Sequence, residues 1–203
     1  LIRGRREKER FLLLDDWSSS VPLGCDGLLF LPYLTGERSP HWRREAKASF
    51  FGIDSHHHRG HFARAVMEGL GFQMKRVFEV MEEVGGAVNE VRFTGGFTRS
   101  PLWSQMMCDI LGREAQIPYV KDSSALGAAA MAALGLGLIP SLAAVKEKVK
   151  VEKSLRPDLE SHQRYQRLYG LFGNLYQDSV RGWEELEQMR ASEALDTREG
   201  GGK

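Results

Sequence analysis

A pair of glycines, Gly95-Gly96, lies between a predicted strand and a predicted helix. Residues 90–94 alternate between apolar and polar side chains as a half-buried strand does, and residues 101–111 carry apolar side chains at helical spacing. Glycine adopts a positive φ without steric cost and has no Cβ to hold a ligand away from the backbone. The chain must therefore accommodate a strand, a tight turn and a helix in direct succession.

The helix that follows the glycines has a recognisable start. Ser100 is a predicted N-cap and Pro101 occupies the first helical position. Amide donors at such a helix start face the turn, and the helix dipole favours anionic or strongly polar groups there. An isolated Gly-Gly pair is more often a tight turn and nothing else. In this setting we interpret the turn as a nucleotide contact.

Strands and helices alternate along the rest of the chain, which predicts an α/β layered domain. Predicted strands cover residues 27–31, 48–53, 90–94 and 114–118, and predicted helices cover residues 59–84, 101–111, 123–135 and 157–190. The helix at 123–135 consists mainly of small residues, which indicates that another backbone element packs tightly against it. We expect a lead-in helix and linker over 1–22, one domain over 23–190 and a flexible tail over 191–203.

Composition limits the class of protein. A net charge of +1 argues against a dedicated nucleic-acid binder, and no apolar run approaches the ~20 residues that a membrane span needs. Cys25 and Cys108 are far apart and form no CxxC motif, so we expect reduced thiols in a cytoplasmic protein. The first residue is leucine, and we expect the chain to be a piece of a longer protein.

Three stretches resemble one known family, the FGGY carbohydrate kinases, in their carboxy-terminal domain. They are residues 26–40 (DGLLFLPYLTGERSP), residues 48–68, with Gly52-Ile53 followed after seven residues by His61-Phe62, and residues 95–110 together with 124–129. The second stretch follows a signature of the family through Glu68. The resemblance extends from about residue 22 to residue 180.

The resemblance implies an actin-like, ribonuclease-H-like lobe that binds ATP. Members of the family transfer the γ-phosphoryl group of Mg²⁺-ATP to a hydroxyl of a sugar or sugar acid. Their catalytic aspartate and most of their sugar site lie upstream of the matched region, in an amino-terminal lobe that would be a partner of this one. By resemblance, Gly96 and Ser100 match nucleotide-contacting positions, with Gly95 and Phe97 beside them. We assign this chain no catalytic residue and no metal ligand.

The residues after the glycines indicate which sugar accepts the phosphoryl group. Phe97 after the glycines, the Thr98-Arg99-Ser100 that follows, and Trp103 are more similar to gluconate kinases than to xylulose kinases. This favours gluconate, converted to 6-phosphogluconate, with xylulose as the alternative. A non-catalytic actin-like module that binds nucleotide through the same turn is the alternative from a different class. A second copy of the chain is a further candidate partner.

Other polar residues invite functional interpretations that we consider weaker. His56, His57, His58 and His61 could bind a metal, but no carboxylate or cysteine completes a convincing ligand set, so chance clustering at an exposed helix start is the simpler account. Glu68 is expected to have a structural or hydrogen-bonding role. The remaining acidic candidates are expected to be caps or surface charges; they are Asp26, Glu37, Asp54 and Asp109.

Overall fold

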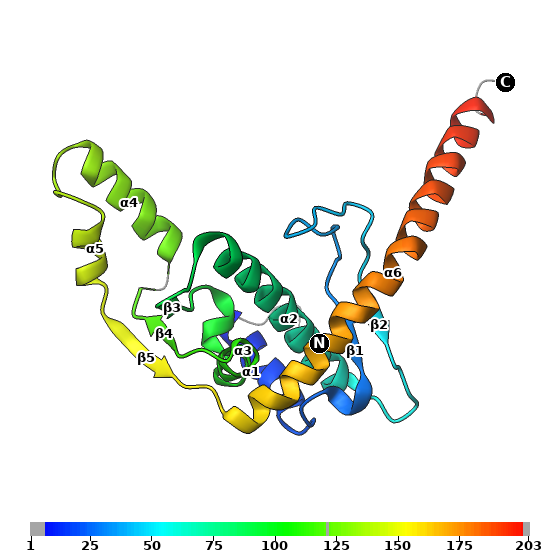
Figure 1. Cartoon of the computed structure of the whole chain (residues 1–203), viewed down its shortest axis with the longest axis horizontal. Helices are drawn as coiled ribbons and strands as arrows, with labels where there is room; N and C mark the ends of the chain where they lie inside the picture. The colour runs from blue at the N-terminus through cyan, green and yellow to red at the C-terminus, as the bar shows by residue number, and fades with distance from the viewer. Residues whose placement is uncertain (1–6, 121, 201–203) are drawn as a thin grey trace.

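The computed structural model describes residues 7–120 and 122–200 and shows helices packed around two small sheets (Figure 1). The elements, in chain order, are α1 (Glu7–Ser19), η1 (Cys25–Gly27), β1 (Leu29–Leu31), β2 (Ser49–Phe51), α2 (Arg59–Gly85), β3 (Val91–Arg92), η2 (Gly96–Arg99), α3 (Pro101–Leu111), β4 (Ala115–Pro118), α4 (Ser123–Gly135), α5 (Ala143–Lys148), β5 (Val151–Leu155) and α6 (Leu159–Gly200). The predicted α/β class is confirmed.

Both sheets are short. β1 and β2 form an antiparallel pair in which Leu29 lies opposite Phe51. The second sheet has the order β3-β4-β5, with β3 parallel to β4 and β4 antiparallel to β5. Parallel neighbours require a crossover connection, and here η2 and α3 supply it between β3 and β4. The predicted strand–turn–helix unit around the glycines is therefore β3 followed by the crossover that connects it to β4.

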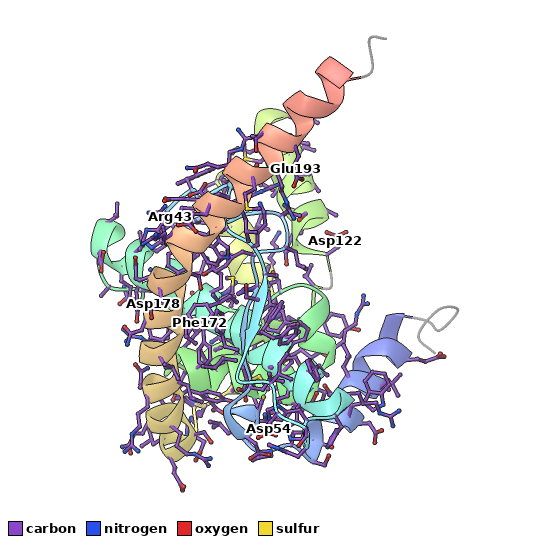
Figure 2. The ribbon with its side chains drawn as sticks, turned by 90° about the vertical axis from the view of Figure 1, so that its right-hand side faces the viewer. Arg43, Asp54, Asp122, Phe172, Asp178 and Glu193 are labelled. Carbon is purple, nitrogen blue, oxygen red and sulfur yellow. The ribbon has the colours of Figure 1, made fainter. Side chains whose placement is uncertain are left out.

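The main core lies where α2, α3 and β1 meet the first half of α6. Apolar side chains recur along α6 at intervals of seven, four and seven residues, which places them on one face of the helix. These buried side chains are Tyr165, Phe172, Tyr176 and Trp183. Phe172 lies on the side of α6 that faces the body and contacts Phe72 of α2, with ring centroids 5.5 Å apart (Figure 2).

A buried carboxylate connects α2, α6 and the residue that precedes η1. Glu68 of α2 is 1% exposed and accepts hydrogen bonds from the Gly24 amide at 3.2 Å, from Nε of Arg64 at 2.9 Å and from the Tyr165 hydroxyl at 3.2 Å. Burial raises the pKa of Glu68, and these donors oppose that shift because they stabilise the charged form. The hydrogen-bonding role expected of Glu68 is confirmed.

The carboxy-terminal region differs from expectation in two ways. α5 and β5 lie in a segment where no element was predicted, because β5 has the exposed, charged sequence Val-Glu-Lys-Ser-Leu with only its last residue buried. α6 continues to Gly200, so residues 191–200 of the expected flexible tail are helical. Alanine, glutamate and leucine after residue 190 are good helix formers and explain the extension. Residues 201–203 and the basic lead at 1–6 lie outside the described part.

α4 also departs from the prediction. It forms over the expected residues, with Asp122 as an N-cap that accepts the Ala125 amide at 2.9 Å. It then projects away from the body beside α5 (Figure 1), and of its thirteen residues only Ala130 is buried. The tightly packed neighbour expected from its small side chains is not supplied by the described residues of this chain.

Glu68→Ala should lower the free energy of unfolding by about 3–5 kcal/mol, because it leaves the Arg64 guanidinium buried without its partner. Urea unfolding monitored by circular dichroism measures the loss. Glu185→Ala is the matched control: it removes an i,i+4 partner of Arg181 on an exposed face of α6 and should change stability by less than about 0.5 kcal/mol. Equal losses in the two variants would show that the buried network is not stabilising.

Candidate functional site

The predicted glycine turn lies between β3 and α3. Gly95 has φ +98° and ψ −175°, a conformation that side-chain-bearing residues rarely adopt, and a Cβ built there would meet no atom within 4 Å. A hydrogen bond inside the turn stabilises it, because the Thr98 hydroxyl donates to the Gly95 carbonyl at 2.7 Å. Gly95 is itself exposed, so open space lies directly beside its backbone.

Ser100 holds the base of this turn. The prediction of an N-cap is confirmed, since its hydroxyl accepts the Trp103 amide at 2.9 Å and Pro101 occupies the first turn of α3. The same hydroxyl donates to the carboxylate of Asp15 in α1. Burial raises the pKa of Asp15, and the hydrogen bond from Ser100 opposes that shift. Ser100 is 1% exposed, so its side chain is enclosed by the protein and bonds within it.

Phe97 points away from the open side of the glycines. Its ring packs against Phe93 and Trp103, with centroids 5.4 Å and 6.0 Å away. These side chains border an apolar cavity of about 430 Å³ between α2, β3 and α3. Of the four predicted site residues, Gly95 is exposed, Gly96 and Phe97 are half-buried, and Ser100 is buried.

The acidic candidates have structural partners, and Glu37 and Asp109 are buried, so these two are not the surface charges that were expected. Glu37 is buried and accepts the hydroxyl of Tyr176 at 3.3 Å as well as two amides of its own loop. Asp109 accepts the Asp158 amide at 2.8 Å, which ties the end of α3 to the start of α6, and burial raises the pKa of Asp109. Asp54 is exposed and bonds within its own turn. None of these contacts involves the glycine turn.

The histidines at the start of α2 form a helix cap. The His58 ring accepts the Gly60 amide at 3.2 Å, and Nδ1 of His61 accepts the His58 amide at 3.2 Å. The structure adds a carboxylate that the sequence does not reveal, because Asp26 lies 3.1 Å from Nε2 of His61, with His56 nearby. Since Nδ1 of His61 accepts a hydrogen bond, the proton of the neutral ring is on Nε2. Metal binding through that atom would therefore break the cap.

Comparison with known proteins decides the family. The C-terminal domain of the FGGY family of carbohydrate kinases matches residues 3–136. The chain belongs to the FGGY family of carbohydrate kinases. It is 40% identical over 153 residues to the gluconokinase of Bacillus licheniformis, a match that covers 75% of this chain and 30% of that protein. It is 32% identical over 174 residues to the xylulose kinase of Staphylococcus epidermidis, covering 85% of this chain and 35% of the relative.

Solved FGGY structures agree with this assignment. Gluconate kinase from Lactobacillus acidophilus superposes with a TM-score of 0.76 at 28% identity, over 88% of this chain and 36% of that one. Xylulose kinase from Rhodospirillum rubrum also superposes with a TM-score of 0.76, at 31% identity, over 90% of this chain and 36% of that one. The fold is thus the actin-like, ribonuclease-H-like ATPase lobe. The chain spans about a third of the length of the relatives that it matches.

Two features of the site were not predicted. Asp15 lies in the lead-in helix, 85 residues before its partner Ser100, and no local pattern links the two. The apolar cavity beside Phe97 is formed by three elements that are separate in the sequence. An indirect signal existed for the cavity, since the apolar stripe of the 59–84 helix continues as far as Val84. In the structure that end of the stripe is not buried.

Ser100→Ala should lower the free energy of unfolding by about 1 kcal/mol or more, through loss of the cap on α3. Thermal and urea unfolding measure the change. Ser192→Ala is the control, because the exposed Ser192 hydroxyl bonds only carbonyls of its own helix and its loss should have little effect. A Ser100 variant as stable as the control would argue against the capping role.

Proposed function

We propose that this chain is the nucleotide-binding, carboxy-terminal lobe of an ATP-dependent sugar kinase that phosphorylates gluconate to 6-phosphogluconate. The observation that carries the proposal is the FGGY match together with the glycine turn, which keeps its open backbone at Gly95. The catalytic base and the sugar site are assigned to the part of the longer protein outside this chain. The lobe would act with that part as its partner.

The residues of this chain would bind and position the nucleotide. The open space where a Cβ of Gly95 would stand fits close approach of a ligand, and the half-buried Gly96 follows it. Phe97 and Ser100 would support the turn from below. ATP supplies the transferred phosphoryl group, and Mg²⁺ neutralises its charge during transfer. We assign Mg²⁺ no ligand in this chain.

Gluconate is favoured over xylulose on two grounds. The Phe97-Thr98-Arg99-Ser100 segment and Trp103 resemble gluconate kinases, and identity to the Bacillus licheniformis gluconokinase is higher than to the Staphylococcus epidermidis xylulose kinase. The superpositions are equal for the two groups, so xylulose remains the second candidate. Two buried cysteines without a disulfide support a cytoplasmic location. No described helix combines the length and apolar character needed to cross a bilayer.

The chain alone should release ADP from Mg²⁺-ATP no faster than background with gluconate, xylulose or glycerol, because it supplies neither the acceptor site nor the base. The full-length protein that carries this lobe should turn over with gluconate. A coupled ADP-release assay measures both. Turnover with xylulose instead would correct the acceptor, and nucleotide binding without turnover on any sugar would favour a non-catalytic module.

Gly96→Val should weaken ATP binding to the full-length protein by about tenfold or more, equivalent to about 1.4 kcal/mol, because a branched side chain would stand where backbone approaches the ligand. Isothermal titration calorimetry measures the affinity. Gly182→Val is the control: it makes the same change on α6, where an added Cβ meets no atom within 4 Å. Unchanged affinity in a folded Gly96 variant would remove the turn from the nucleotide site.

A further inference from the structure

Imidazole rings and a carboxylate meet at the start of α2. Nε2 of His61, in the first turn of this helix, lies 3.1 Å from a carboxylate oxygen of Asp26. His56 completes a group of three whose candidate ligand atoms all lie within 4.8 Å of one another. Asp26 precedes His61 by 35 residues, so the group exists only in the folded chain. Two imidazoles and one carboxylate are ligand types that zinc and related ions bind.

The spacing of these atoms suits a single ion after a small rearrangement. Zinc lies about 2.0–2.2 Å from nitrogen and oxygen ligands, so two atoms bound to one ion are at most roughly 4 Å apart. The side chains of Asp26 and His56 are 45% and 52% exposed, which leaves them room to rotate. His61 is buried and held in place by the protein. The group therefore combines one immobile ligand with two that a metal can draw together.

The backbone that carries Asp26 has an uncommon conformation. All four residues 24–27 have positive φ, and two of them are not glycine, Cys25 at +52° and Asp26 at +50°. Side-chain-bearing residues adopt this region rarely, because Cβ then approaches the backbone. The consequence of this left-handed turn is that the Asp26 carboxylate reaches the start of α2 and contacts His61.

The neighbouring His57 ring has an unsatisfied nitrogen. Its Nδ1 accepts the Asp54 amide at 2.9 Å, so the proton of the neutral ring is on Nε2. That Nε2 is buried and has no hydrogen-bond partner among the described residues, which is costly for a polar atom. The centroid of the ring lies 4.3 Å from that of His56 and 4.9 Å from that of His61. An ion bound at the neighbouring group would bring water oxygens, which are acceptors for this nitrogen.

The charges around the rings favour a cation. Asp54 adds a second carboxylate, 3.7 Å from Nδ1 of His56. The basic side chain beside the cluster, Arg59, lies over the ring of Trp17 at 4.9 Å from its centroid. Carboxylates attract any divalent cation, whereas imidazole nitrogens select zinc, nickel or copper over magnesium and calcium. The set is therefore suited to a transition metal.

We propose that Asp26, His56 and His61 form a binding site for a divalent transition metal such as Zn²⁺, with water completing the coordination. The bound ion would join the turn before β1 to the loop between β2 and α2 and to α2 itself. Chance clustering was the simpler account of the histidines because the sequence showed no carboxylate beside them, and the folded chain supplies one. No residue of the glycine turn takes part, so the inference goes beyond the proposed function and does not depend on it.

Metal binding at His61 has a structural consequence. Nδ1 of this ring accepts the His58 amide at 3.2 Å. A neutral ring that binds a metal through Nε2 carries its proton on Nδ1 and can no longer accept that amide. The contact of the His58 ring with the Gly60 amide remains. The metal thus replaces one half of the cap on α2, and this exchange distinguishes binding at His61 from binding elsewhere.

Isothermal titration calorimetry with zinc chloride tests the site on the full-length protein, without a polyhistidine tag and without ATP. Asp26→Asn and His56→Gln should each weaken Zn²⁺ binding at least tenfold, since loss of even an outer partner of a metal ligand costs about 10–100-fold. Both variants should fold, because asparagine tolerates a positive φ and His56 is exposed. His41→Gln, at an exposed histidine outside the group, is the matched control and should leave the affinity unchanged. Excess Mg²⁺ should not compete, because it prefers oxygen ligands.

The His61 ring gives a second readout. Imidazole proton–nitrogen correlation spectra of histidine-labelled protein distinguish a proton on Nε2 from one on Nδ1. Zn²⁺ should move the proton of His61 from Nε2 to Nδ1 and shift the signal of the His58 amide. A His61 proton that stays on Nε2 in the zinc-saturated protein would overturn the proposal.

Absence of Zn²⁺ binding would also overturn it, as would equal affinity in the unmodified protein, Asp26→Asn and His56→Gln. Weakening by His41→Gln as large as that by the two site variants would count against it as well, because binding would then not be specific to the group. Sugar phosphorylation is scored separately. A protein that turns over sugar without binding Zn²⁺ contradicts this site alone, and Zn²⁺ binding without turnover contradicts the proposed function alone.

Discussion

The carboxylate of Glu68 is the contact on which the arrangement of this lobe depends. Transfer of a charge into the interior is costly, and burial accordingly raises the pKa of this group. The cost is offset because the amide of Gly24, the guanidinium of Arg64 and the hydroxyl of Tyr165 all donate to it. Since the donors come from the residue that precedes η1, from α2 and from α6, the carboxylate can be satisfied only when these segments meet in one geometry. A buried ion pair such as Arg64–Glu68 is weak evidence for stability, but its need for hydrogen bonds selects one arrangement of the surrounding elements.

The position of the glycine turn follows from that frame. α2 packs along α3, and α1 contacts α2, α3 and η2. The hydroxyl of Ser100 then joins the turn to both neighbours, because it caps α3 and donates to Asp15 of α1. The buried Ser100 side chain and the exposed Gly95 backbone thus have different roles. Ser100 keeps the turn in place, and Gly95 leaves room for a ligand at its surface.

Local chemistry accounts for what the sequence predicted well. The apolar spacing of residues 101–111 and the N-cap at Ser100 are encoded within a few residues of the helix that they determine. β5 escaped prediction because its exposed, charged residues lack strand alternation. The Asp15–Ser100 contact escaped it because the two residues meet only through tertiary packing. Periodicity reports which face of an element is apolar and does not report which element covers that face.

The prediction of a packed neighbour for α4 illustrates this limit. Its small side chains and the apolar stripe of α2 both indicate burial, yet only Ala130 of α4 and no residue of α2 after Lys75 is buried. The free edge of β3 adds a third unsatisfied surface. All three are surfaces whose apolar or hydrogen-bonding pattern the described residues of this chain leave uncovered.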